Sequence, residues 1–152
     1  MSSGAEDIQD LYSTTLRDLA RNPAHRGKLD NAAATARGDN PMCGDRVDIF
    51  LNFDGPRIGE TRFVARGCEI CQASAAMLAE MVPGKSPDEA RALGEGVKTM
   101  ARTGQTNDST GEMARLSIFA VVHKFPSRVK CATLAWSALD AALSGVRETS
   151  SE

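Results

Sequence analysis

The chain lacks the features that would indicate a membrane or nucleic-acid function. No apolar run is long enough to span a bilayer. Neither sign of charge dominates, because 18 Lys and Arg residues stand against 20 Asp and Glu residues. The net charge therefore favours neither nucleic acid nor an anionic membrane as a partner. A length of 152 residues is enough to bury a real core, and we expect a single domain over residues 1–152.

The first residues are acidic and show no signal-peptide pattern, so a cytoplasmic location is expected. In a reducing compartment the 4 cysteines are expected to serve metal ligation or thiol chemistry rather than structural disulfides. With only 2 histidines in the chain, any metal site must depend on sulfur and carboxylate ligands.

The first half of the sequence predicts one helix and a hairpin. Apolar residues at helical spacing predict an amphipathic helix over 5–20, either docked on the domain or offered to a partner. Residues 21–42, which include His25, show no period and predict a long loop. Alternation over 46–53 predicts a half-buried strand, and a second strand is expected over 57–66, with a bulge near Gly59.

The second half predicts helices, so the fold class is α+β. A helix is expected over 71–82, another after the capping Ser86, a third over 112–124, and a last one from a Ser127 cap to about Leu143. A polar loop is expected over 103–111, and the tail after Gly145 is expected to fray. This order indicates a small antiparallel sheet of about three strands, over about 46–66, with helices over about 71–143 packed on one face.

One short motif suggests half of a metal site. The stretch Asn40-Pro41-Met42-Cys43-Gly44-Asp45-Arg46 places a thiol and a carboxylate two residues apart across a glycine. Gly44 permits a tight turn, including a positive φ, at little steric cost. Two side chains flanking such a turn can point at one atom, as metal ligands must.

Two further cysteines complete a candidate ligand set. Cys68 lies just before a predicted helix, where backbone N–H groups favour a thiolate, and Cys131 lies in the first turns of the last helix. Three sulfurs and the Asp45 oxygen make the four ligands of a tetrahedral zinc. The four ligands carry more negative charge than a divalent ion neutralises. The basic neighbours that can offset the excess are Arg46, Lys130 and Arg128, the last of which lies one helical turn before Cys131.

Four motifs, in this order, resemble the IscU/NifU-like scaffold proteins, and most closely their SufU branch. They are Asn40-Pro41-x-Cys43-Gly44-Asp45, Gly67-Cys68-x-Ile70-x-x-Ala73-Ser74, Gly84-Lys85-Ser86 and Lys130-Cys131-Ala132-Thr133-Leu134-Ala135-Trp136. Two features favour the SufU branch. Lys130 stands where IscU scaffolds have a histidine, and residues 94–115 resemble the insertion of SufU-type proteins.

The resemblance implies a zinc protein of the SufE/NifU (IscU-like) fold that accepts sulfur. SufU-like proteins take persulfide sulfur from a SufS-like cysteine desulfurase and pass it toward iron–sulfur cluster assembly, on a SufBCD-like scaffold complex. By this resemblance Cys43, Asp45, Cys68 and Cys131 bind Zn²⁺, and Cys43 is the sulfur acceptor. We expect the loop-borne Cys43 to be the ligand that leaves. Arg128 matches an arginine near the third cysteine of that branch.

Two other functions remain open from the sequence. The same ligands can hold a [2Fe–2S] cluster on a scaffold, although less completely than four cysteines would. A structural zinc domain that docks partners through the N-terminal helix is the third alternative. Cys71 departs from the usual serine of the relatives, and it is a tolerated replacement, a substitute ligand or a resolving thiol.

Overall fold

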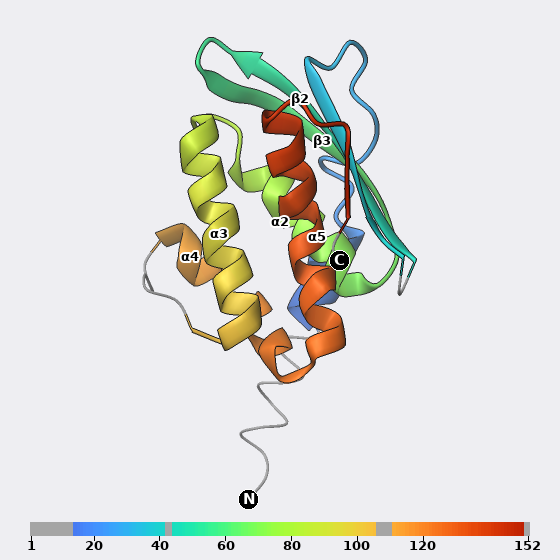
Figure 1. Ribbon diagram of the computed structural model, residues 1–152, viewed down its shortest axis with the longest axis vertical. Helices are drawn as coiled ribbons and strands as arrows, with labels where there is room; N and C mark the ends of the chain where they lie inside the picture. Colours follow the sequence, from blue (N-terminus) through green and yellow to red (C-terminus); the bar gives the residue numbers. More distant parts are fainter. Residues whose placement is uncertain (1–13, 42–43, 106–110, 151–152) are drawn as a thin grey trace, which may run out of the picture.

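The computed structural model describes residues 14–41, 44–105 and 111–150. Figure 1 shows two layers, with the helices covering one face of a twisted sheet. The elements are β1 (Ala34–Asn40), β2 (Asp45–Asp54), β3 (Arg57–Arg66), α2 (Glu69–Met81), α3 (Pro87–Thr103), α4 (Gly111–Leu116), the 3₁₀ helix η1 (Ser117–Lys124), α5 (Pro126–Leu143) and β4 (Glu148–Ser150). The α+β class is therefore confirmed. No helix in the described ranges is both long and apolar enough to cross a membrane.

The predicted N-terminal helix is only partly within the described residues. Residues 14–21 are helical, and the remainder of the predicted range 5–20 lies outside the described part of the chain. Leu16 and Ala20 are buried against the main core. This part of the helix is therefore docked on the molecule rather than offered to solvent.

The described residues form a four-stranded sheet in the order β3-β2-β1-β4. β2 pairs antiparallel with both β1 and β3, which confirms the predicted hairpin. The register shifts between Leu51 and Phe53, opposite Gly59, so the predicted bulge is confirmed. Val47, Ile49 and Leu51 are fully buried as the alternation predicts, but Phe53 is 41% exposed near the hairpin tip.

The prediction of a loop over 21–42 was wrong, because β1 occupies Ala34–Asn40. The strand alternates in burial, but its inward residues are Ala36, Gly38 and Asn40, so no apolar period appears in the sequence. The reason is the closeness of α5. A Cβ at Gly38 would lie 3.0 Å from Leu134 Cδ1 and 3.3 Å from the Leu134 carbonyl oxygen. Only small side chains fit between this strand and the helix.

The prediction of a frayed tail after Gly145 was also wrong. Residues Glu148–Ser150 form β4, which pairs parallel with β1 at the edge of the sheet. The sheet is therefore mixed rather than purely antiparallel, and it has one strand more than predicted. The polar sequence gave no strand signal because a short edge strand is held by backbone hydrogen bonds and needs no apolar side.

Of the predicted helices in the second half of the chain, one starts as predicted, one starts at a different residue and one is divided in two. α3 begins with the predicted Ser86 cap, and Glu89 completes it as a capping box. α5 begins at Pro126 with Phe125 at the N-cap, so the predicted cap at Ser127 was wrong. A proline already fits the first helical position, where its missing N–H has no partner to lose. The predicted helix over 112–124 is divided into α4 and η1.

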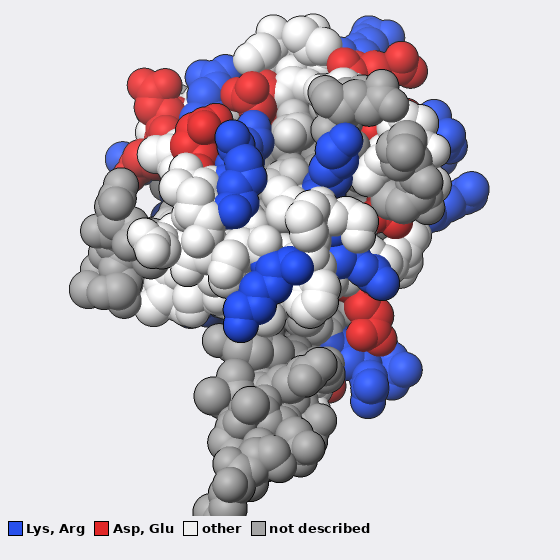
Figure 2. All heavy atoms as spheres, turned by 60° about the horizontal axis from the view of Figure 1, so that its bottom comes forward, with Lys and Arg blue, Asp and Glu red and all other residues white. Residues whose placement is uncertain are grey.

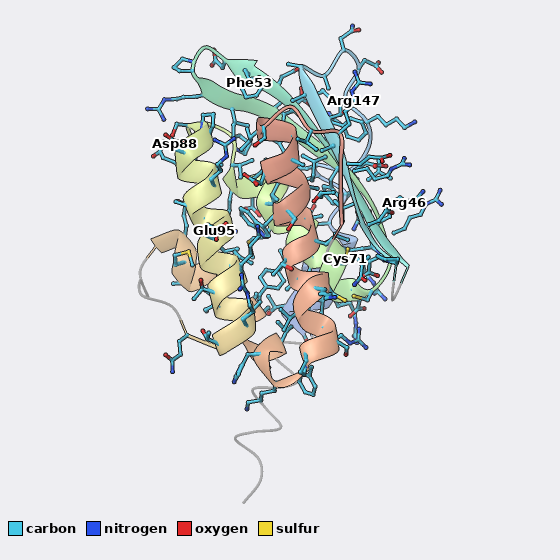
Figure 3. The ribbon with its side chains drawn as sticks, in the orientation of Figure 1. Arg46, Phe53, Cys71, Asp88, Glu95 and Arg147 are labelled. Atoms are coloured by element: carbon cyan, nitrogen blue, oxygen red, sulfur yellow. The ribbon has the colours of Figure 1, made fainter. Side chains whose placement is uncertain are left out.

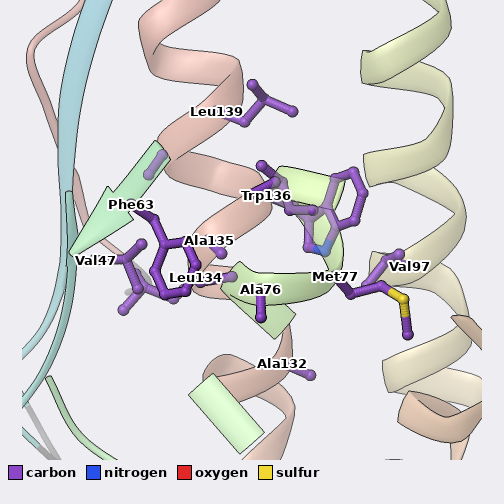
Figure 4. Close-up of a cluster of buried hydrophobic side chains, with 14 of the residues drawn as sticks. Val47, Phe63, Ala76, Met77, Val97, Ala132, Leu134, Ala135, Trp136 and Leu139 are labelled. Atoms are coloured by element: carbon purple, nitrogen blue, oxygen red, sulfur yellow. The ribbon is translucent and has the colours of Figure 1, made fainter. Parts of the chain in front are cut away.

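α5 lies at the centre of the molecule and is buried almost all round. Trp136 projects from it toward Met77 of α2 and Val97 of α3, while Phe63 and Val47 of the sheet approach from the other side (Figure 4). These side chains are all at least 95% buried. A helix packed on every side holds its residues rigidly, and this includes Cys131 near its start.

Candidate metal centre

The carboxylate of the candidate site comes from the start of β2. The turn from β1 is closed by a hydrogen bond of 2.8 Å from the Gly44 N–H to the Asn40 carbonyl. Gly44 has a φ of 77°, so the predicted left-handed turn is confirmed. Asp45 follows and is 3% exposed. Cys43, predicted as a ligand and as the sulfur acceptor, lies outside the described residues, as does Met42.

The second group of the site is Cys68, the N-cap residue of α2. Its backbone N–H donates to Asp45 Oδ1 over 3.1 Å, and its Sγ lies 3.7 Å from Asp45 Oδ2. The preceding Gly67 makes this approach possible. Its φ is 130°, and a Cβ there would collide with Asp45 Oδ1 and lie 2.7 Å from Asp45 Cγ. Sequence reasoning missed this role, since a glycine before a cysteine gives no sign of which side chain will cover it.

The third group is Cys131, in the second turn of α5. It is 2% exposed, and its Sγ lies 3.9 Å from the Ser127 carbonyl oxygen one turn earlier. Within the described residues, Asp45, Cys68 and Cys131 form a group whose ligand atoms all lie within 4.8 Å of one another. Two thiols and a carboxylate at this spacing could serve as three ligands of a tetrahedral metal ion, which would need one more.

The two thiols of the group have very different pKa values. The pKa of Cys68 is lowered to about 6, chiefly by the neighbouring Cys131 thiol and less by the N–H groups of Cys71 and Ile70, against the opposing effects of burial and of the Asp45 charge. The pKa of Cys131 is raised far above its usual range by the Cys68 thiolate and by its own burial. Without a metal, one thiolate and one thiol are therefore expected at neutral pH.

Two of the basic residues predicted to offset the ligand charge, Arg46 and Arg128, differ in whether they form an ion pair. Arg46 forms an ion pair of 2.9 Å with Asp39. The Arg128 side chain is exposed and makes no ion pair with any described residue. Arg128 belongs to an acid-free stretch, because residues 113–139 contain no Asp or Glu. Figure 2 shows the end of the molecule in this region, where blue Lys and Arg side chains lie across a largely uncharged surface.

The remaining candidate residues lie outside the group. Cys71 is buried in the first turn of α2, and its label in Figure 3 marks the end of the molecule near the site. The ring of His123 contacts its own 3₁₀ helix through Nδ1, 2.8 Å from the Ala120 carbonyl. The backbone of His25 pairs with Phe63 of β3. Neither histidine is among the described residues whose ligand atoms gather at the candidate site.

Comparisons with known proteins agree with this fold. The family model of the NifU-like N-terminal domain matches residues 11–132. The chain is 38% identical to the iron–sulfur cluster assembly scaffold protein IscU of Streptococcus pyogenes, over 90% of this chain and 84% of that protein. It is 31% identical to the zinc-dependent sulfurtransferase SufU of Bacillus subtilis, over 88% of this chain and 90% of that protein.

A solved structure gives the same result. A SUF-system protein from Fervidobacterium islandicum, described as a candidate iron–sulfur cluster assembly scaffold, superposes with a TM-score of 0.81 at 33% identity, covering 88% of this chain and 96% of that one. The match of a family model to most of the chain establishes the relationship. The chain belongs to the family of NifU-like N-terminal domains.

Proposed function

We propose that the protein is a zinc-dependent acceptor of persulfide sulfur, which it takes from a SufS-like cysteine desulfurase for iron–sulfur cluster assembly. The observation that carries the proposal is the group of Asp45, Cys68 and Cys131. A family member with 31% identity is named as a zinc-dependent sulfurtransferase. The onward recipient in this proposal is a SufBCD-like scaffold complex.

The donor set fits zinc. Thiolate sulfur and carboxylate oxygen are common zinc ligands, and the three described donors are close enough to share one ion. Asp45 and Cys131 are almost completely buried, so they are shielded from competing water. In the proposal, Cys43 supplies the fourth donor. Bound zinc would keep the thiols deprotonated and would moderate their nucleophilicity.

The residues have separate tasks. The Cys43 thiolate attacks the outer sulfur of the donor's persulfide, so that a new S–S bond forms at Cys43 while the donor cysteine departs as a thiolate. Cys68 and Cys131 are anchored on helices, and Asp45 is fixed by the Cys68 N–H. These three therefore hold their positions while the loop-borne Cys43 exchanges. Arg128, exposed and without a described acidic partner, provides a positive charge for an anionic group of the desulfurase.

Access to the site supports transfer between proteins. Asp45 lines an open hollow of about 800 Å³, whose other walls come from the β1–β2 turn, Arg66 and the edge strand β4. A segment of a partner protein can enter such a hollow. Figure 2 shows several Lys and Arg side chains on the neighbouring end of the molecule, and these suit an acidic partner.

The second candidate is a scaffold that assembles a [2Fe–2S] cluster on the same ligands. It is favoured by the relative with 38% identity, which is named as such a scaffold. A cluster held by cysteine and aspartate is less fully thiolate-ligated than the usual four-cysteine site. The presence of Lys130 in place of a histidine removes a further ligand of the scaffold type.

One experiment distinguishes the candidates. The protein is purified without reconstitution, its metal and sulfide are measured, and sulfur release by a SufS-like desulfurase is followed with and without it. We expect the protein to be colourless, to contain zinc and to stimulate the desulfurase. Asp45→Ala should lose both the zinc and the stimulation. Cys43→Ser should lose stimulation, whereas Cys71→Ser, outside the ligand group, serves as the matched cysteine control.

Other results would change the assignment. A brown protein that contains iron and sulfide would support the scaffold. Zinc without any stimulation would support a structural zinc domain. Full stimulation by Cys43→Ser would refute the acceptor role of Cys43.

A further inference from the structure

Cys71 is a third described thiol beside the site, and nothing in the proposed function uses it. It lies three residues after Cys68, in the first turn of α2, and its side chain is completely buried. It is not one of the three residues whose ligand atoms lie within 4.8 Å of one another. A thiol one helical turn from a candidate ligand, but outside the ligand group, offers that cysteine a reaction partner rather than offering the metal a ligand.

The geometry at the start of α2 suits a bond between the two sulfurs. Cys68 has an extended backbone (φ −70°, ψ 166°), so its side chain precedes the helix and can turn back over the first turn. The N–H of Cys71 already lies near enough to influence the Cys68 sulfur. The rise and radius of an α-helix place Cα atoms three residues apart at about 5 Å, within the range of about 4.4–6.8 Å that disulfides span.

We propose that Cys68 and Cys71 form a reversible disulfide when a peroxide reaches the metal-free site. Cys68 is the thiol that is oxidised, because it is the more exposed of the two. Cys71 is the resolving thiol. The inference goes beyond sulfur transfer and does not rest on it, since it requires only the start of α2.

The chemistry balances with peroxide as the oxidant. The Cys68 sulfur attacks one oxygen of hydrogen peroxide, the O–O bond breaks, and a sulfenic acid forms with release of hydroxide. The Cys71 sulfur then attacks the Cys68 sulfur. The S–S bond forms, the S–O bond breaks, and the oxygen leaves as water. The two thiols lose two electrons and the peroxide gains them.

Cys131 is the competing partner, because its sulfur also lies near Cys68. A Cys68–Cys131 disulfide would join the start of α2 to the separate helix α5, and its two sulfurs would still have to approach to the S–S bond length of about 2 Å. A Cys68–Cys71 disulfide would join residues of a single turn and would leave the packing of α2 on α5 unchanged. It would withdraw one ligand from the site and leave Asp45 and Cys131 in place.

The consequence is a redox-gated site. While the disulfide persists, only two of the three described ligands remain. The oxidised protein should therefore not take up metal until a thiol reductant restores Cys68. The disulfide would also protect Cys68 from the irreversible sulfinic and sulfonic states.

Tryptic peptide mapping of the full chain tests the proposal directly. Metal-free protein is treated with hydrogen peroxide, remaining thiols are blocked, and the digest is examined by mass spectrometry. Cleavage after Arg66 and Lys85 leaves Cys68 and Cys71 in one peptide, 67–85, whereas Cys43 lies in 38–46 and Cys131 in 131–147. We expect peptide 67–85 to be lighter by two hydrogens and not joined to another peptide. Zinc binding should be lost in the same sample and restored by reductant.

Two variants keep the test decisive. Cys131→Ser should still form the disulfide within 67–85, and Cys71→Ser should lose it and accumulate Cys68 oxidised to sulfinic acid. Circular dichroism establishes that both variants fold, and Cys71→Ala replaces Cys71→Ser if that variant does not. A crosslink between 67–85 and 131–147 or 38–46 as the main product would overturn the proposal. Equal recovery of Cys68 thiol in Cys71→Ser and the parent would overturn it as well.

Discussion

Gly67→Ala should damage both the fold and the candidate metal centre. Gly67 has a φ of 130°, and side-chain-bearing residues in such conformations cost about 1–3 kcal/mol each. The added methyl group would also overlap the Asp45 carboxylate. Moving that carboxylate would break its hydrogen bond from the Cys68 N–H, and a buried bond to a charged group is worth about 1.5–3 kcal/mol. Together these terms predict a loss of about 2.5–6 kcal/mol, a large part of the roughly 5–15 kcal/mol typical of a domain.

The assay for this prediction is urea unfolding of metal-free protein, followed by zinc titration of the folded fraction. Gly55→Ala is the matched control, because Gly55 also has a positive φ (61°) but a Cβ there would have no atom within 4 Å. The control should lose only about 1–2 kcal/mol and should bind zinc as the parent does. If Gly67→Ala is no less stable than Gly55→Ala and keeps full zinc affinity, the close approach of Asp45 to Gly67 is not a constraint and the reasoning fails.

Three further predictions concern the site and the fold. In metal-free protein, the rate of alkylation of Cys68 should reach half its maximum near pH 6 rather than near the ordinary cysteine pKa of about 8.5. Asp45→Asn should move this midpoint to a still lower pH, because the Asp45 charge disfavours the thiolate. A midpoint above pH 8 in tryptic mapping of alkylated peptides would contradict this. Gly38→Val should destabilise the protein by about 1–3 kcal/mol in urea titrations, since a Cβ there would lie 3.0 Å from Leu134, and unchanged stability would show that the strand can move away. Ser86→Ala should cost about 1 kcal/mol through loss of the α3 cap, whereas Ser86→Asp should retain most of it; equal loss in both would argue against capping.

The sequence predicted those parts of the fold whose signals are local. The alternation of Val47, Ile49 and Leu51 and the capping box at Ser86 each depend on residues a few positions apart, and both were confirmed. β1 was missed because its inward residues are small. Their size is set by α5, about 100 residues later in the chain, and no local pattern contains that information. β4 was missed because an edge strand can be polar throughout.

The candidate site was predictable to a similar extent. Cysteine and aspartate types in loop and helix-start positions indicated Asp45, Cys68 and Cys131, and the structure brings these three together. The contribution of Gly67 was not predictable, because it depends on which side chain packs over its α-carbon. The role of Cys43 stays a prediction, since it lies outside the described residues.

The parallel pairing of β4 with β1 has a consequence for how the protein folds. It joins Arg37 to Glu148, so the edge of the sheet is completed by residues more than a hundred positions apart. The ligand group likewise draws on β2, α2 and α5. Contacts of such long range require large loops to close, which slows folding. In an unfolded or partly synthesised chain the three ligands are therefore far apart and form no binding site. Metal binding should follow folding rather than direct it.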